Sequence, residues 1–185
     1  MNRVALRFES QLARLDSLVV KAAAERNNLH KEVLLSYVVV RLHDQWNFRS
    51  RQIVLTSYGK SEERMMKCLR TNWTQKRNMD IGWEPDWHIP ANTIRAAQIL
   101  DIQDLIQVRD AIGSVSSIDD VRWTRNAIVH NMPTSFTKYR KMALDKYHLA
   151  SIIPFCLPLE INPITGNTIY QDWCEELSGA LRCAL

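Results

Sequence analysis

The stretch TRNAIVHN, residues 124–131, carries an arginine, an asparagine and a histidine within an otherwise apolar helical segment. The histidine, His130, can take up or release a proton near neutral pH, because an ordinary imidazole has a pKa of about 6.5. The arginine, Arg125, stays charged and presents a planar fork that suits a phosphate group. Asn126 follows it directly. This set is either the polar edge of a buried helix or the centre of an active site.

The position of the arginine on its helix favours the second interpretation. On a helical wheel at about 100° per residue, Val121, Ile128 and Met132 form one apolar face. Val129 lies at the edge of this face, and Arg125 falls inside it. Because an unpaired guanidinium is costly to bury, we expect Arg125 to meet a carboxylate, a phosphate or a cleft that is open to water.

The histidine lies on another side of the same helix. His130 is about 140° round from Arg125, so the two side chains converge poorly in one straight helix. Asn126 is four residues before His130 and is expected to fix the imidazole by a hydrogen bond. Two copies of the helix packed across a twofold axis would bring both pairs into one cleft. We therefore predict a homodimer formed through the 118–131 helix.

The elements that must position these residues are predicted to be helical throughout. The composition is lean in turn formers, with 5 Gly and 6 Pro, and residues 1–185 suit one domain. The fold class expected is an all-α helical bundle of four to five main helices. A tryptophan-rich loop at about 72–90 and an extended, proline-rich connection at about 152–167, with a short strand near 157–161, interrupt it. Hydrophobic periodicity indicates helices over residues 4–26, 29–57, 60–71, 91–112, 117–131, 135–148 and 168–183.

Several helix boundaries have local signals. Asn27 is a suitable N-cap for the long second helix, and a bend is expected near Asp101. Ser117 and Asp120 have the S-x-x-D spacing of a capping-box-like start for the motif helix. Pro133 should end that helix, since proline disfavours helical geometry in the residue before it.

The distribution of charged and aromatic residues is compatible with the binding of nucleic acid. The net charge of +4 is segregated: residues 41–77 hold nine Lys/Arg against three acids, 78–120 two against eight, and 121–148 six against one. Such basic stretches suit a polyanion such as RNA, or they are solvated helix faces. Trp73, Trp83 and Trp87 could likewise stack on bases or pack inside the domain.

Other classes of protein are disfavoured by what the sequence lacks. It has no run of 18 apolar residues, so we expect no membrane span, and its charged start is not that of an export signal. The four cysteines are scattered without a C-x-x-C pair, which predicts reduced thiols in a cytoplasmic protein. No zinc-type spacing and no phosphate-binding glycine loop is present. We therefore expect no metal site and no cofactor.

The segment RNAIVH, residues 125–130, resembles the R-x4–6-H motif of the HEPN superfamily, including the polar residue after the arginine. The resemblance implies a helical bundle that dimerises, with the active site between two copies of the motif helix. Many HEPN proteins are metal-independent endoribonucleases of toxin–antitoxin, CRISPR and anti-phage systems. RNA would then be the substrate, and a cognate antitoxin or a defence-system protein a further partner.

The same resemblance implies a role for each residue of the motif. His130 would be the general acid or base in the attack of the RNA 2′-hydroxyl on the adjacent phosphorus. Arg125 would hold the phosphate and stabilise its developing charge, and Asn126 would orient the histidine or bind a phosphate oxygen. The products would carry 2′,3′-cyclic phosphate ends. Met132 departs from the tyrosine that antitoxins modify in related toxins, which puts that form of control in doubt.

Two other functions stay open from the residues alone. One is a non-catalytic HEPN-like module that binds a nucleotide or a protein. The other is a helical adaptor in which Arg125 pairs with a buried acid such as Asp101 or Asp104. His43 and His88 are weaker candidates for a catalytic role, and a satisfied surface or interface histidine is the expected role of His43.

Overall fold

The computed structural model describes residues 3–73 and 83–184. Within them lie eight α-helices and one 3-10 helix: α1 (Arg3–Ala24), α2 (Asn28–Tyr58), α3 (Glu62–Asn72), α4 (Pro90–Leu100), α5 (Leu105–Gly113), α6 (Ser117–His130), α7 (Pro133–Tyr147), η1 (Pro154–Leu159) and α8 (Ile169–Cys183). The prediction of an all-α bundle is confirmed. None of the helices in the described ranges is long and apolar enough to cross a membrane.

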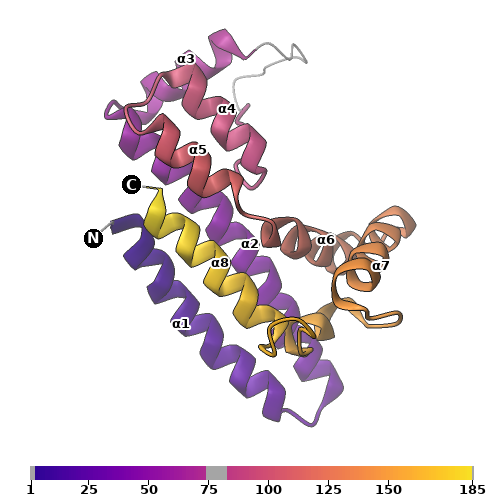
Figure 1. The fold of residues 1–185 in the computed structure, drawn as a ribbon. Coiled ribbons are helices and arrows are strands. Elements are labelled where there is room, and N and C mark those ends of the chain that lie inside the picture. The colour runs from indigo at the N-terminus through magenta and orange to yellow at the C-terminus, as the bar shows by residue number, and fades with distance from the viewer. Residues whose placement is uncertain (1–2, 74–82, 185) are drawn as a thin grey trace.

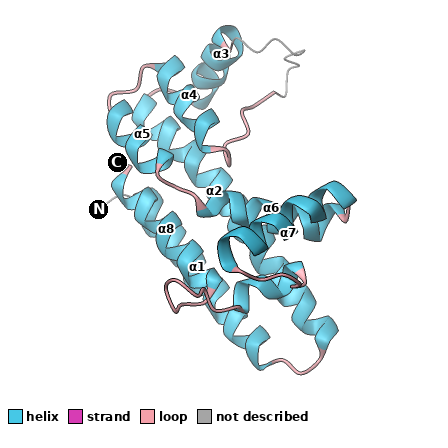
Figure 2. Ribbon diagram, turned by 45° about the vertical axis from the view of Figure 1, so that its right-hand side comes forward, coloured by secondary structure: helices cyan, strands magenta, loops and turns pink. Residues whose placement is uncertain are grey.

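The long helices α1, α2 and α8 run alongside one another and form the body of the bundle (Figure 1). The short helices α3, α4 and α5 gather at one end of α2. The helices α6 and α7 project to the side (Figure 2), where α6 packs against α2, α7 and α8. The motif helix is therefore held on one side by the body of the bundle and on another by α7.

The central helix α2 begins and ends where local chemistry requires. Asn27 is its N-cap, as predicted: the side-chain oxygen accepts hydrogen bonds from the backbone N–H of Leu29 at 3.0 Å and of His30 at 3.2 Å. The helix ends at Gly59, whose φ of 65° is the left-handed conformation that glycine adopts without strain. Between these ends α2 runs for 31 residues, long enough to contact both α1 and α6.

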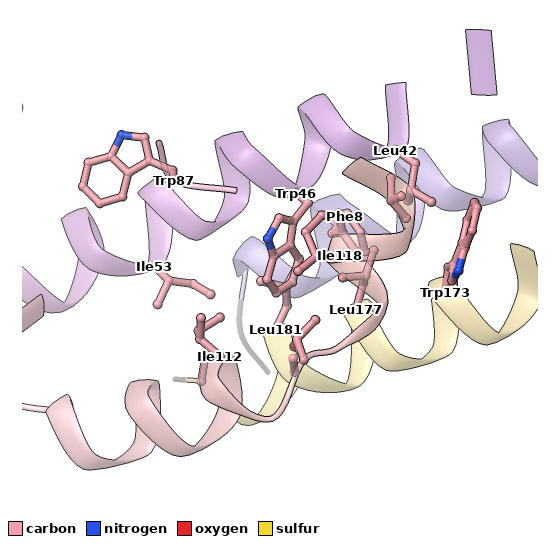
Figure 3. Packing of buried hydrophobic residues seen from close by; sticks show 14 of the residues in the cluster. Phe8, Leu42, Trp46, Ile53, Trp87, Ile112, Ile118, Trp173, Leu177 and Leu181 are labelled. Atoms are coloured by element: carbon pink, nitrogen blue, oxygen red, sulfur yellow. The ribbon is translucent and has the colours of Figure 1, made fainter. Parts of the chain in front are cut away.

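One continuous apolar core joins the helices. Figure 3 shows side chains of α1, α2, α5, α6 and α8 turned toward the same interior, among them Phe8, Trp46, Ile112 and Leu181. All four are fully or almost fully buried. Burial of a large apolar side chain contributes about 1.5–3 kcal/mol, so this packing fixes where α6 sits.

The tryptophan-rich loop supplies part of that core. Trp73 and Trp87 are buried, and Trp83 packs against the core with its ring 5.3 Å from that of Trp73. Of the two alternatives for this loop, packing inside the domain is the one observed for these three side chains. The rest of the loop, residues 74–82, lies outside the described residues.

The predicted strand near 157–161 is wrong. Pro154–Leu159 form the 3-10 helix η1, and the only β-type pairing among the described residues is an isolated bridge between Ile161 and Thr168. Proline has no N–H to donate to a β-ladder, and η1 contains both Pro154 and Pro158. The connection at 152–167 is thus partly helical rather than extended.

The expected bend near Asp101 is a complete break between two helices. Asp101 is the C-cap of α4 with a φ of 49°, a left-handed conformation. The segment predicted as one helix over 91–112 is therefore α4 followed by α5.

Candidate functional site

The start of α6 is held by another helix and not by its own capping box. Ser116 is the N-cap, and no side-chain capping bond forms there. Instead the carboxylate of Glu176 on α8 accepts hydrogen bonds from the backbone N–H of Ser116 at 2.6 Å and of Ser117 at 3.1 Å. The prediction of a capping box from Ser117 and Asp120 is wrong, because a carboxylate distant in sequence satisfies the same free N–H groups.

Hydrogen bonds of Asp120 link α6 to the rest of the bundle. Asp120 is buried, and its carboxylate accepts hydrogen bonds from the ammonium of Lys146 and from the hydroxyl of Tyr147. The Tyr147 hydroxyl in turn accepts a hydrogen bond from the indole N–H of Trp173 on α8, at 3.1 Å. Burial raises the pKa of Asp120, against the effect of Lys146. This network links α6, α7 and α8 one to two turns before the motif.

The buried face of α6 agrees with the predicted one only in part: Val121 is buried, as predicted, and Ile128 packs against the core. Thr124 and Ala127 are buried as well, whereas Val129 is 46% exposed. Met132 is 55% exposed and lies beyond the end of α6, which stops before Asn131. The apolar face predicted from the helical wheel therefore continues onto the surface and ends in solvent.

Arg125 and His130 meet within one chain. The Nη1 atom of Arg125 lies 2.8 Å from Nε2 of His130. Because a guanidinium can only donate, Nε2 is the acceptor and the imidazole proton lies on Nδ1. The expectation that the two side chains converge poorly within one helix is wrong, since the length of arginine spans the angle between them.

Asn126 orients the arginine rather than the histidine. Its side-chain oxygen accepts a hydrogen bond from Nη1 of Arg125 at 3.0 Å, and no hydrogen bond to His130 is observed. The expected hydrogen bond that fixes the imidazole therefore comes from Arg125.

The guanidinium of Arg125 has no carboxylate partner among the described residues. Its Nε atom is buried without a hydrogen-bond partner. Asp101 and Asp104, the acids that an adaptor would use, are exposed and do not pair with it. Arg125 therefore keeps a half-buried positive charge that an anion could neutralise.

Two further histidines lie near enough to this arginine for its charge to act on them. His43 of α2 is buried, and its ring centroid is 4.6 Å from that of His88, which precedes α4. The His43 Nδ1 atom makes no hydrogen bond and lies 3.7 Å from the Asp44 carboxylate. His43 is thus buried, and one of its ring nitrogens lacks a hydrogen-bond partner. The sequence instead led us to expect a satisfied histidine at the surface or at an interface. No spacing in the sequence joins residues 43, 88 and 125; only the packing of α6 on α2 brings them together.

The surroundings keep these two imidazoles neutral. Burial lowers the pKa of His43 to about 4, with further contributions from His88 and Arg125. Burial also lowers the pKa of His88; Asp86 opposes this, and the charges of Arg122 and Arg125 add to it. The site therefore combines a fixed positive charge with neutral imidazoles, which is suited to an anionic ligand.

The low pKa of His43 predicts a loss of stability in mild acid. The unfolded chain binds a proton at His43 near pH 6.5, whereas the folded protein resists it down to about pH 4. The contribution of His43 to the free energy of unfolding should therefore fall by about 3 kcal/mol between these values, at ~1.4 kcal/mol per pKa unit, and level off below them. Urea unfolding at a series of pH values measures this.

A variant assigns the effect to that residue. His43→Phe keeps a ring in the buried position and should make the dependence on pH shallower, leaving the part that is due to His88. His148→Asn, at an exposed position with a φ of 59° that asparagine tolerates, should leave it unchanged. Equal slopes in the wild type and His43→Phe would contradict the assignment.

The described residues contain no group of three or more His, Cys, Asp or Glu side chains that could hold a metal ion. Comparisons of the whole chain with family models, with curated proteins and with solved structures find no match.

Proposed function

We propose that this protein is a metal-independent endoribonuclease of the toxin or anti-phage defence type, with an active site of the HEPN kind. The observation that carries the proposal is the 2.8 Å contact between Arg125 and His130. It joins a proton-transfer group to a phosphate-binding group at a place where the arginine has no carboxylate partner in the described part of the chain.

The proposed reaction needs only these two kinds of group. His130 Nε2 removes the proton of the RNA 2′-hydroxyl, whose oxygen attacks the adjacent phosphorus. The bond from phosphorus to the 5′-oxygen breaks, and that oxygen takes a proton from an imidazolium or from water. Arg125 stabilises the negative charge on the phosphoryl oxygens. The products are a 2′,3′-cyclic phosphate and a 5′-hydroxyl.

The observed contact represents the state before substrate binds. In it the lone pair of His130 Nε2 accepts from Arg125 and is not free to act as a base. A phosphate attracts the guanidinium more strongly than a neutral imidazole does, so substrate would draw Arg125 away and release Nε2. Asn126, which accepts a hydrogen bond from the same Nη1 atom, would keep the arginine on this side of α6.

We further propose that the enzyme works as a twofold homodimer through α6, in the cytoplasm, with a cognate antitoxin or a defence-system protein as partner. The dimer is favoured by Val129 and Met132, apolar side chains that are 46% and 55% exposed close to His130 in sequence. A second copy would cover them and add its own histidine as the proton donor. Light scattering at micromolar concentration should give the mass of a dimer; a monomer both with and without RNA would contradict this.

The proposed chemistry predicts that cleavage does not depend on a divalent ion. Activity on a single-stranded RNA should persist in excess EDTA, because proton transfer and charge stabilisation come from side chains. The new 3′ ends should become free for ligation only after the cyclic phosphate is removed. Activity that disappears with the chelator and returns with Mg²⁺ or Mn²⁺ would contradict the proposal.

A further inference from the structure

A second basic site lies between α1 and α2. A small pocket of about 180 Å³ opens there, lined by Gln11, Arg14, Leu15, Leu18, Tyr37, Arg41 and Gln45. Arg41 is about 200° round α2 from His43, at 100° per residue, so this pocket and the Arg125 site face different sides of α2. Arg49 donates a hydrogen bond to Gln45 of this pocket, and the charge of Arg7 acts on Arg49. We call the pocket, together with Arg7 and Arg49, the α1–α2 groove.

The groove collects positive charge that no acid neutralises. Arg7, Arg14, Arg41 and Arg49 form no ion pair with a carboxylate in residues 3–73 and 83–184. On α2 the residues Arg41, Gln45 and Arg49 recur every four positions, so they lie along one side of the helix. The groove thus gathers four arginines, of which Arg7 and Arg14 are exposed, Arg41 is half-buried and Arg49 is buried.

Of these four arginines, Arg49 gives the strongest indication that the groove binds an anion. It is only 7% exposed, and its Nε atom is buried without a hydrogen-bond partner. Its Nη2 donates a long hydrogen bond of 3.4 Å to Gln45. Burial lowers the pKa of Arg49, and the nearby charge of Arg7 lowers it further. A buried guanidinium beside a like charge is costly, and an anion in the groove would remove that cost.

Aromatic side chains accompany the cations. Tyr37 lines the pocket and is 51% exposed. Phe48 is 46% exposed, and the guanidinium of Arg49 lies 5.0 Å from the centre of its ring. Cations that follow a phosphate backbone, interleaved with exposed rings on which bases stack, are the elements of a surface that binds single-stranded nucleic acid.

We propose that the α1–α2 groove binds single-stranded RNA, with Arg14 and Arg41 contacting phosphates and Tyr37 stacking on a base. That the strand is RNA rests on the proposed ribonuclease function; affinity for a single-stranded phosphate backbone does not. The groove would hold substrate away from the cleaved bond, so it contributes to binding and leaves the chemical step to Arg125 and His130.

The test measures binding without cleavage. The probe is a fluorescent 2′-O-methyl oligoribonucleotide, which lacks the attacking hydroxyl, and the readout is anisotropy at several salt concentrations. The double variant Arg14→Gln/Arg41→Gln should bind more weakly. The slope of log K against log salt should also become shallower by about 1.4, at ~0.7 for each lost contact on a single strand. The control Arg26→Gln/Lys60→Gln, which removes the same charge from exposed loop positions, should keep the slope of the wild type.

Substitutions of Tyr37 separate stacking from charge. Tyr37→Ala should weaken binding by about five-fold or more, the usual cost of losing one stacked base, and leave the salt slope unchanged. Tyr37→Phe should restore the affinity. Thermal melts establish that each variant is folded.

The outcomes distinguish this proposal from the proposed function. If the wild type binds the probe through the groove but never cleaves RNA, the proposed ribonuclease function is contradicted, whereas the proposed binding of RNA in the groove is supported. If Arg14→Gln/Arg41→Gln binds as the control does, or if inorganic phosphate alone competes as well as the oligonucleotide, the groove proposal is overturned. Failure of the wild type to bind the probe overturns it as well.

Discussion

His130→Ala is expected to slow RNA cleavage by about 10²–10⁴-fold, the range that general acid–base catalysis usually contributes. Binding of RNA should change little, because a neutral imidazole adds no net charge. The structure sharpens this expectation, since removal of the imidazole also frees the Nη1 atom of Arg125 that now lies 2.8 Å from it. RNA affinity should therefore stay equal or rise slightly while the rate falls.

The measurement pairs single-turnover cleavage with binding of the uncleavable oligonucleotide. His148→Asn replaces an exposed histidine at the C-cap of α7, where the φ of 59° suits asparagine better than alanine, and serves as the control for the loss of a histidine. If His130→Ala binds RNA and cleaves it at the rate of this control, the histidine is not the proton-transfer group. A wild type that binds but does not cleave would point to the non-catalytic module.

A structural feature of this protein can be predicted from the sequence when it depends on residues that are close together in the chain. The Asn27 cap and the end of α6 before Pro133 depend on neighbouring residues, and both are confirmed. The bend expected near Asp101 lies at the right position but is a break between two helices. Strong periodicity likewise predicted the helical character of the chain. The strand near 157–161 was wrong because apolar residues between prolines do not distinguish a 3-10 helix from an extended segment.

The features that failed at the site depend on partners distant in sequence. Ser117 and Asp120 have capping spacing, yet Glu176 performs the capping and Asp120 bonds to Lys146 and Tyr147. A helical wheel places Cα atoms and ignores the reach of side chains, which is why it separated Arg125 from His130. The wheel also places Val129 only at the edge of the apolar face, and the packing of α2, α7 and α8 leaves that edge exposed.

The neighbours of Arg125 were the least predictable. The charge of Arg125 acts on His43 and His88 only because α6 packs on α2 and the ring of His88 lies against that of His43. Their titration is consequently coupled to the charge of an arginine many residues away. This coupling provides a measurement of the arginine's position that does not depend on activity.

Arg125→Ala is expected to impair both cleavage and RNA binding, with a loss in rate of about 10²–10³-fold, as for removal of one donor that stabilises transition-state charge. Arg125→Lys should recover binding better than rate, because an ammonium retains the charge but lacks the planar fork. The fold should survive in both, since Arg125 has no carboxylate partner within the described residues and its Nε is unpaired. Its removal relieves a poorly compensated charge, so the melting temperature should stay the same or rise.

The pKa of His43 gives the independent readout. Because the charge of Arg125 helps to hold this pKa near 4, Arg125→Ala should raise it, as NMR titration of the imidazole protons would measure. Arg140→Ala, at an exposed arginine of α7, removes the same charge elsewhere and should leave the pKa of His43, the melting temperature and the cleavage rate unchanged. If Arg125→Ala instead unfolds the protein, the arginine is structural and the adaptor function gains support. If it folds, raises the pKa of His43 and cleaves RNA at the rate of the wild type, Arg125 lies where the structure has it but takes no part in catalysis.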